Sequence, residues 1–242
     1  MPLLDRTLPC DELVLIHPAS PPPSACFPSS ATPSQPACPP LAACPPASAS
    51  SPLAAGSPMA TDSPLTSDIP LPAGYRWCAH PEQRRSQWAH LMESCGFPFT
   101  PAEALDFWDA MEATDPAVFA ANLFFIVDAE NNLAATCSLW PGAHFDPARW
   151  RLHWVMCAPE HQGRGLAEAA CQAACRAFYL DPDKHGPLYV VTQAQSWAAI
   201  RLYKKLGFVP YEGATCKATA EKNRAAWQQA RAAIGKRYGY EV

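Results

Sequence analysis

The sequence has few charged residues and no long hydrophobic run. Only 17% of its 242 residues are charged, compared with about a quarter in a typical globular protein. No run of 18 apolar residues occurs, so we expect no membrane-spanning helix. Residues 1–75 hold one of the 18 basic and five of the 22 acidic residues, which leaves 17 of each for residues 76–242. This neutral balance argues against a protein that binds nucleic acid by neutralising phosphates.

The first residues also lack the features of a targeting signal. They show neither a basic segment followed by an apolar one, as in a secretory signal, nor the Arg-rich composition of a mitochondrial presequence. We therefore expect a cytoplasmic protein whose 11 cysteines stay reduced. Spacings such as Cys38–Cys44 and Cys171–Cys175 match no strong zinc-binding pattern, so we expect no metal site.

Charge is absent altogether from residues 13–61, which consist largely of Pro, Ala and Ser. Residues 1–75 contain 18 of the 28 prolines, a composition that does not build a packed core. We expect residues 1–72 to form a disordered low-complexity tail, and a chain that starts near Ala73 to fold without it. A tether, a ligand for proline-binding modules and an inert extension all remain open as roles for this segment.

Residues 73–242 show alternating strand and helix patterns, which predict one mixed α/β domain. Strands are expected at 74–80, 123–140, 150–159, 187–193 and 208–213, of which 123–140 is a hairpin that turns at Asn131 and Asn132. Helices are expected at 81–96, at about 163–180, from Ser196 to Leu206, and at 219–236. A further helix is expected to begin at the capping box that Thr100 and Glu103 form.

A glycine-containing turn stands between the strand at 150–159 and the helix that follows. It reads Gln162-Gly163-Arg164-Gly165-Leu166-Ala167. Glycines let the backbone approach a ligand closely, and the start of the next helix presents free N–H groups to an anion such as phosphate. The turn has no GK[ST] sequence, and position 168 is Glu168 where a dinucleotide fingerprint needs glycine. The phosphates therefore belong to a different cofactor.

This turn resembles the Q/R-x-x-G-x-G/A loop of the GNAT superfamily of acyl-CoA-dependent N-acyltransferases. A second segment, TQAQSWAAIRLYKKLGFVPY at 192–211, is similar to the later helix and strand that carry the tyrosine of that superfamily. The resemblance covers about residues 73–211, with its core motifs at 150–211. It implies a central mixed β-sheet flanked by helices, and acetyl-CoA as co-substrate.

The resemblance also implies which residues contact coenzyme A. The backbone near Met156 and Cys157 would pair with the pantetheine arm, where two strands splay apart. Ser196 takes a cofactor-contacting position at which the family often has Asn. The pyrophosphate would rest on the loop residues Gln162, Gly163, Arg164, Gly165, Leu166 and Ala167. For Arg164, a phosphate contact and a solvated side chain both remain open.

Acyl transfer to an amine requires one proton to leave the amine and another to reach the thiolate. Tyr203 matches the tyrosine of the family, and its ordinary pKa of about 10 suits it to protonate a thiolate whose pKa is about 8.5. His153 is the candidate general base, because the pKa of histidine lies near 6.5. A packed strand histidine and a water chain are alternatives for the base.

The sequence thus predicts an N-acetyltransferase that acts by direct attack of an amine on acetyl-CoA in a ternary complex. The acceptor is a small-molecule or peptide amine of unspecified class, bound by residues at about 81–121 and 141–149. Two alternatives remain: a non-catalytic acyl-CoA-binding regulatory module, and a proline-rich adaptor whose folded part has no activity of its own. The oligomeric state is open.

Overall fold

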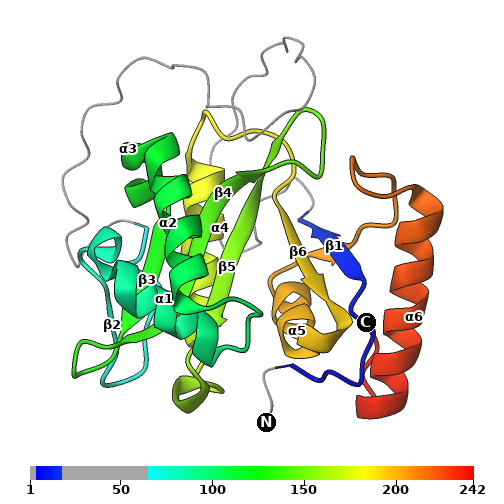
Figure 1. Ribbon diagram of the computed structural model, residues 1–242, viewed down its shortest axis with the longest axis horizontal. Helices are drawn as coiled ribbons and strands as arrows, with labels where there is room; N and C mark the ends of the chain where they lie inside the picture. Colours follow the sequence, from blue (N-terminus) through cyan, green and yellow to red (C-terminus); the bar gives the residue numbers. More distant parts are fainter. Residues whose placement is uncertain (1–3, 18–64) are drawn as a thin grey trace. The chain divides into compact units, whose positions relative to one another are not determined.

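The computed structural model describes residues 4–17 and 65–242 (Figure 1). The chain divides into two compact units, and each is described here by itself. Of the described residues, unit one comprises residue 4, residues 65–140 and Leu152–Asp181. Unit two comprises residues 5–17, Pro141–Arg151 and Pro182–Val242.

Unit one is built on a run of strands in the order β2-β3-β4-β5. Their bounds are Arg76–Trp77 for β2, Leu123–Val127 for β3, Leu133–Gly142 for β4 and Arg149–Cys157 for β5. The antiparallel pair β3 and β4 is the expected hairpin, and Asn131 adopts a positive φ of 70° in its turn. Asparagine tolerates this conformation better than most residues, which is why the turn could be located in the sequence.

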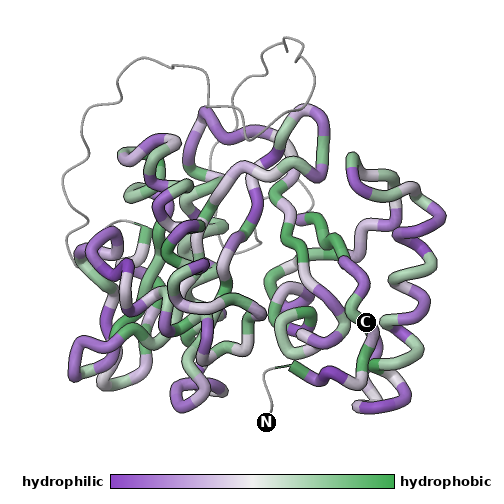
Figure 2. Tube along the Cα trace, in the orientation of Figure 1, coloured by the Kyte–Doolittle hydropathy of each residue, from purple (hydrophilic) through white to green (hydrophobic). Residues whose placement is uncertain are grey.

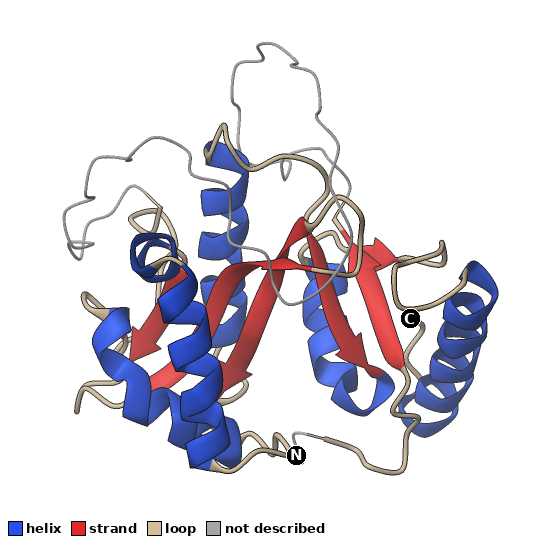
Figure 3. Ribbon diagram, turned by 45° about the horizontal axis from the view of Figure 1, so that its top comes forward, coloured by secondary structure: helices blue, strands red, loops and turns tan. Residues whose placement is uncertain are grey.

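Helices cover both faces of these strands (Figures 1 and 3). The helices are η1 at Pro81–Arg84, α1 at Arg85–Ser94, α2 at Pro101–Thr114, α3 at Pro116–Ala121 and α4 at Leu166–Leu180. Every residue of β3 is buried, because alternate residues of the strand pack in one core cluster with residues of α1 and α2, and the opposite face of β3 packs against α4.

Local signals placed several of these helix ends. The capping box is present at the start of α2, where Thr100 accepts from the backbone of Glu103 and the Glu103 side chain accepts in return from Thr100. Gly96, the expected stop after α1, has a positive φ of 78°. The expected helix at 81–96 instead begins as the 3₁₀ turn η1 and becomes α-helical at Arg85.

Unit two is built on three strands in the order β6-β1-β7, with bounds Tyr189–Gln193, Glu12–Ile16 and Val209–Pro210. Helices α5 at Trp197–Lys205 and α6 at Ala220–Tyr238 complete it, with the 3₁₀ turn η3 at Ala194–Ser196 before α5. The expected apolar face of α6 is buried and consists of Trp227, Ala230 and Ile234. The last expected strand, at 208–213, is reduced to the two residues of β7.

The middle strand β1 corrects the expected tail at residues 1–72. Glu12–Ile16 pairs antiparallel with β6 along its whole length and with β7 through Leu15 and Ile16. Leu15 is fully buried, and Figure 2 shows hydrophobic stretches along β1 and β6. The prediction was wrong for this segment because proline content was averaged over 75 residues, and ELVLI is an ordinary strand sequence without proline. Residues 65–72 of the expected tail are also described, and Thr66 and Ile69 are buried. The remaining parts of the expected tail, 1–3 and 18–64, lie outside the described residues.

Polar contacts also connect Asp5 and His17, on either side of β1, to the rest of unit two. The Asp5 carboxylate accepts hydrogen bonds from the Thr7 hydroxyl and from the Tyr238 hydroxyl at the end of α6, both at 2.5 Å. The backbone N–H of Asp5 donates to the carbonyl of Gln195 at 3.0 Å. His17 Nε2 lies 3.0 Å from the carbonyl oxygen of Leu206. In residues 4–17 and 65–242, no helix is both long and apolar enough to span a bilayer.

Removing side-chain volume from β1 should therefore destabilise the protein. We expect Leu15→Ala to lower the free energy of unfolding by about 2–5 kcal/mol, as for other fully buried leucines. Asp11→Ala is the control, because Asp11 is exposed just before β1 and its loss should cost less than about 0.5 kcal/mol. Urea titration followed by circular dichroism measures both. An unchanged midpoint for Leu15→Ala would contradict the placement of β1.

The contacts of Asp5 should make stability depend on pH. Hydrogen bonds from Thr7 and Tyr238 hold the pKa of Asp5 well below its ordinary value of 3.8. A lowered pKa means that this stabilisation is present above about pH 4 and is lost as pH falls further, because the unfolded state binds the proton more readily. We expect Asp5→Asn to have a shallower loss of melting temperature between pH 5 and pH 2 than the parent. Parallel curves for the two proteins would remove Asp5 from the acid transition.

Candidate functional site

The turn between β5 and α4 has the geometry that the sequence suggested. After the 3₁₀ turn η2 at Pro159–His161, Gly163 and Gly165 adopt positive φ values of 74° and 81°. A Cβ atom at either position would meet no atom within 4 Å. A lack of space is therefore not the reason for glycine at these two positions. The reason is the left-handed backbone conformation, which costs other residue types about 1–2 kcal/mol.

The N-terminus of α4 is available to an anion. Gly165 is the N-cap of this 15-residue helix, and in a glycine no side chain can accept from the first N–H groups. Gly163, Arg164 and Gly165 are all exposed. An uncapped helix start with exposed glycines before it attracts negative charge through its N–H groups and dipole.

The loop is tied to the end of β5 through the carbonyl oxygen of Cys157. Gln162 Nε2 donates to this oxygen at 3.3 Å, and the thiol of Cys95, the residue after α1, donates to it at 3.5 Å. The Arg164 guanidinium donates to the carbonyl of Glu160 at 3.3 Å, so its side chain folds back over the loop. The expected cofactor residues Met156, Cys157 and 162–167 thus form one continuous segment of unit one.

Two thiols beside this segment are poor nucleophiles. Burial raises the pKa of the Cys157 thiol to about 12 and that of the Cys95 thiol to about 11. Because the thiolate is the reactive form, both side chains are almost wholly protonated and unreactive near neutral pH. They act here as small buried side chains.

A row of three polar side chains supports the loop from the side and was missed in the sequence. The Tyr75 hydroxyl lies 2.9 Å from His161 Nδ1, and His161 Nε2 lies 3.6 Å from a carboxylate oxygen of Asp128. Asp128 is buried and accepts from the backbone and side-chain amides of Asn132 at 2.7 and 3.2 Å. The Arg164 guanidinium lies 5.8 Å from the centre of the Tyr75 ring. No local signal could have found this row, since its members come from three distant segments.

The candidate base His153 lies half-buried on β5, next to an unusual backbone position. Trp154 has a φ of 48°, a conformation that bulky residues rarely adopt and that occurs often at functional sites. The carbonyl oxygen of His153 accepts from the Ser138 hydroxyl of β4 at 3.0 Å, and that of Trp154 accepts from Thr136 at 2.9 Å. Side chains of β4 therefore hold this part of β5 in place.

The two remaining predicted site residues lie in unit two, at the two ends of α5. Ser196 is the N-cap of α5 as expected, but its side chain makes no capping hydrogen bond. Tyr203 is buried, with 4% of its surface exposed, and its ring centre lies 6.0 Å from that of Phe208. Among the described residues, no group of histidine, cysteine, aspartate or glutamate side chains could hold a metal ion.

Comparisons with known proteins agree with the resemblance seen in the sequence. The model of the acetyltransferase (GNAT) family matches residues 80–208, which is more than half of the chain. No curated protein sequence matches the chain.

Similar solved structures include acetyltransferases of low sequence identity. A GCN5-related N-acetyltransferase from Sphaerobacter thermophilus is 21% identical, with 59% of this chain and 43% of that chain covered and a TM-score of 0.45. A putative GNAT-family acetyltransferase from Bordetella pertussis is 20% identical, with coverage of 56% and 89% and a TM-score of 0.45. Diaminobutyrate acetyltransferase EctA from Paenibacillus lautus, in complex with its substrate and coenzyme A, is 12% identical, with coverage of 55% and 74% and a TM-score of 0.39. The chain spans less than half of the Sphaerobacter protein.

The row formed by Tyr75, His161 and Asp128 should slow amide hydrogen exchange in the loop. Tyr75→Phe removes the hydroxyl that meets His161, and one hydrogen bond contributes about 0.5–1.5 kcal/mol. We expect amide hydrogen exchange at residues 163–166 to accelerate about two- to tenfold, with little change in the global melting temperature. Tyr240→Phe, in unit two, serves as the control. Unchanged exchange in Tyr75→Phe would show that the loop does not depend on this row.

Proposed function

The chain belongs to the acetyltransferase (GNAT) family, and on that premise we propose that it transfers an acetyl group from acetyl-CoA to an amine nitrogen of a small-molecule or peptide acceptor. The observation that carries the proposal is the turn before α4, with two left-handed glycines and an uncapped helix start. This arrangement suits a pyrophosphate, and acetyl-CoA supplies one.

In this proposal, the segment from β5 to α4 binds the co-substrate. Backbone N–H groups of residues 162–167 hold the pyrophosphate, and the backbone near Met156 and Cys157 pairs with the pantetheine amides. Arg164 adds a charge-assisted contact only after its side chain leaves the Glu160 carbonyl. Ser196 contributes a further contact at the start of α5.

The acetyl group passes directly from sulfur to nitrogen. The neutral amine attacks the thioester carbonyl carbon, a C–N bond forms, the C–S bond breaks, and the amine loses a proton. The high pKa of the Cys157 thiol argues against an acetyl-cysteine intermediate on this strand. His153 accepts the proton from the amine, and the Tyr203 hydroxyl donates one to the departing thiolate.

We also propose that the protein acts in the cytoplasm, a compartment in which thiols stay reduced. The cysteines among the described residues are all free, and most are buried. A non-catalytic acyl-CoA-binding module is the competing function. It would bind the co-substrate without releasing coenzyme A, so turnover separates the two.

Gly165→Gln tests the pyrophosphate site. The added side chain would stand where the phosphates bind, so we expect affinity for coenzyme A to fall at least tenfold in calorimetric titration. Gly239→Gln is a matched control, because Gly239 is also left-handed, with a φ of 62°, has open space around it, and lies at the end of α6. Equal affinities for the two variants would refute the assignment of the turn.

Tyr203→Phe tests the acid. It keeps the buried ring and removes only the hydroxyl, so we expect kcat to fall about 10²–10⁴-fold while the affinity for acetyl-CoA changes less than about tenfold. The measurement is release of free thiol from acetyl-CoA with a panel of amines. Near-parental turnover would assign the proton to solvent or another group.

His153→Ala should reduce the rate most below the pKa of the amine, and an equal reduction at all pH values would assign His153 to packing.

A further inference from the structure

Aromatic side chains line the surface of unit one where α1, α2 and β5 meet. We call four of them the aromatic wall: Phe97, Phe99, Phe107 and Trp154. All four are incompletely buried, and Phe107 is 37% exposed. Ring centres lie 4.9 Å apart for Phe99 and Phe107, 5.7 Å for Phe97 and Trp154, and 5.9 Å for Phe107 and Trp154.

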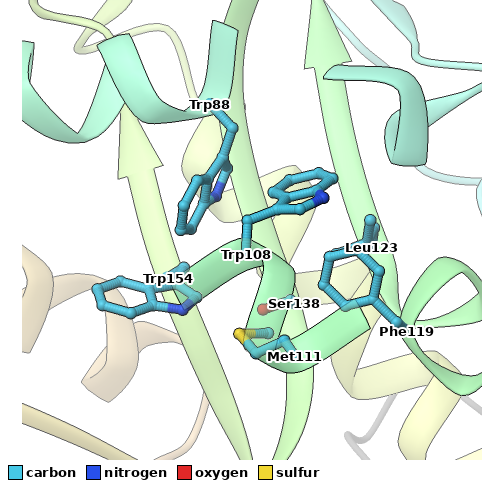
Figure 4. A pocket seen from close by; sticks show the side chains of 7 residues that line it. All are labelled: Trp88, Trp108, Met111, Phe119, Leu123, Ser138 and Trp154. Atoms are coloured by element: carbon cyan, nitrogen blue, oxygen red, sulfur yellow. The ribbon is translucent and has the colours of Figure 1, made fainter. Parts of the chain in front are cut away.

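Behind the wall, Trp154 borders a gap that reaches into the core (Figure 4). The gap between the side chains is nowhere wide enough for a water molecule. The seven residues that line it carry no charge: Trp88, Trp108, Met111, Phe119, Leu123, Ser138 and Trp154. A ligand can therefore enter only if a wall residue moves, and it must be apolar where it enters.

Trp154 is the wall residue best suited to move. Its indole nitrogen is buried yet has no hydrogen-bond partner, so a rotation of the ring breaks no hydrogen bond. A buried donor without a partner is uncommon and destabilises the arrangement that contains it. Its backbone is left-handed and strained, and its ring contacts other rings, including Trp88 with 5.6 Å between the ring centres.

Trp154 also lies close to the strand segment assigned to acetyl-CoA. It precedes Met156 and Cys157 by two and three residues on β5, which corresponds to about 7–10 Å along a strand. We propose that the aromatic wall binds the apolar body of the acceptor, so the acceptor is a primary amine that carries an aryl or alkyl group. This inference rests on the proposed function and adds the substrate class.

Charge argues against polar acceptors at this surface. The charged side chains of Arg85 and Asp109, which join α1 to α2, are paired with each other, with a bond of 2.6 Å from Arg85 Nε. The side chains of the wall itself are phenyl and indole rings, which carry no charge. Bringing a carboxylate or a second ammonium against these rings would remove water from the charged group without a compensating bond, which is unfavourable.

The first experiment compares acceptors matched in length. Hexylamine and 2-(2-aminoethoxy)ethanol have equally long chains, but the second replaces apolar groups with oxygens. We expect kcat/KM to be at least tenfold higher for hexylamine, and putrescine to be poorer than both. Phenethylamine distinguishes an aryl from an alkyl preference. Equal or better use of the ether alcohol would overturn the inference while leaving the acetyltransferase proposal intact.

The second experiment uses Phe107→Ala, which is tolerable because Phe107 is partly exposed. We expect KM for hexylamine to rise about tenfold in Phe107→Ala, with kcat and the affinity for coenzyme A unchanged. In Phe107→Leu, we expect KM to stay close to the parental value. Leu180→Ala is the matched control, since Leu180 is 41% exposed at the end of α4, outside the wall. Equal KM values for Phe107→Ala and the parent would overturn the inference.

A binding measurement separates the two proposals. Saturation-transfer NMR detects hexylamine or phenethylamine bound to the protein in the presence of coenzyme A, without any turnover. Binding that Phe107→Ala weakens, in a protein that acetylates no amine, would support the wall as a binding site and overturn the proposed function. Acetylation of amines, together with an NMR signal that does not depend on Phe107, would support the proposed function and overturn the wall as a binding site.

Discussion

The left-handed backbone of Gly163 and Gly165 is the constraint on which the rest of the site depends. It forms the last part of the connection from β5 to α4, directly before the first residue of the helix. It also leaves the first turn of α4 without a side-chain cap, because glycine has none to offer. The same two residues thus create the free N–H groups and keep the approach to them open.

Unit one surrounds this turn with side chains that restrain it without filling it. The hydroxyl of Tyr75 meets His161 at one side, and the amide of Gln162 returns to the carbonyl of Cys157 at the other. These contacts connect the loop to strands β2 and β5, whose positions come from packing in the core. Preorganised donors bind an anion more tightly than a loose loop, because less ordering is needed on binding.

Unit two shows how composition can mislead. ELVLI is only five residues long, and the proline-rich sequence after it dominates any average over the N-terminal region. Its pairing with β6 joins residues about 180 positions apart in the chain. Strand pattern alone identifies such a segment as a candidate strand, but only the register of Leu15 against Val190 shows which strand it joins.

The sequence by itself determined the elements whose causes are local. The capping box of Thr100, the turn at Asn131, the glycine turn and the family-like motifs each lie within a few neighbouring residues. Only the tertiary structure decided which distant residues meet: Tyr75 with His161, Asp5 with Tyr238, and the rings of the aromatic wall. The left-handed conformation of Trp154 belongs to the second group, because a bulky residue adopts it only when packing against other segments outweighs the local steric cost.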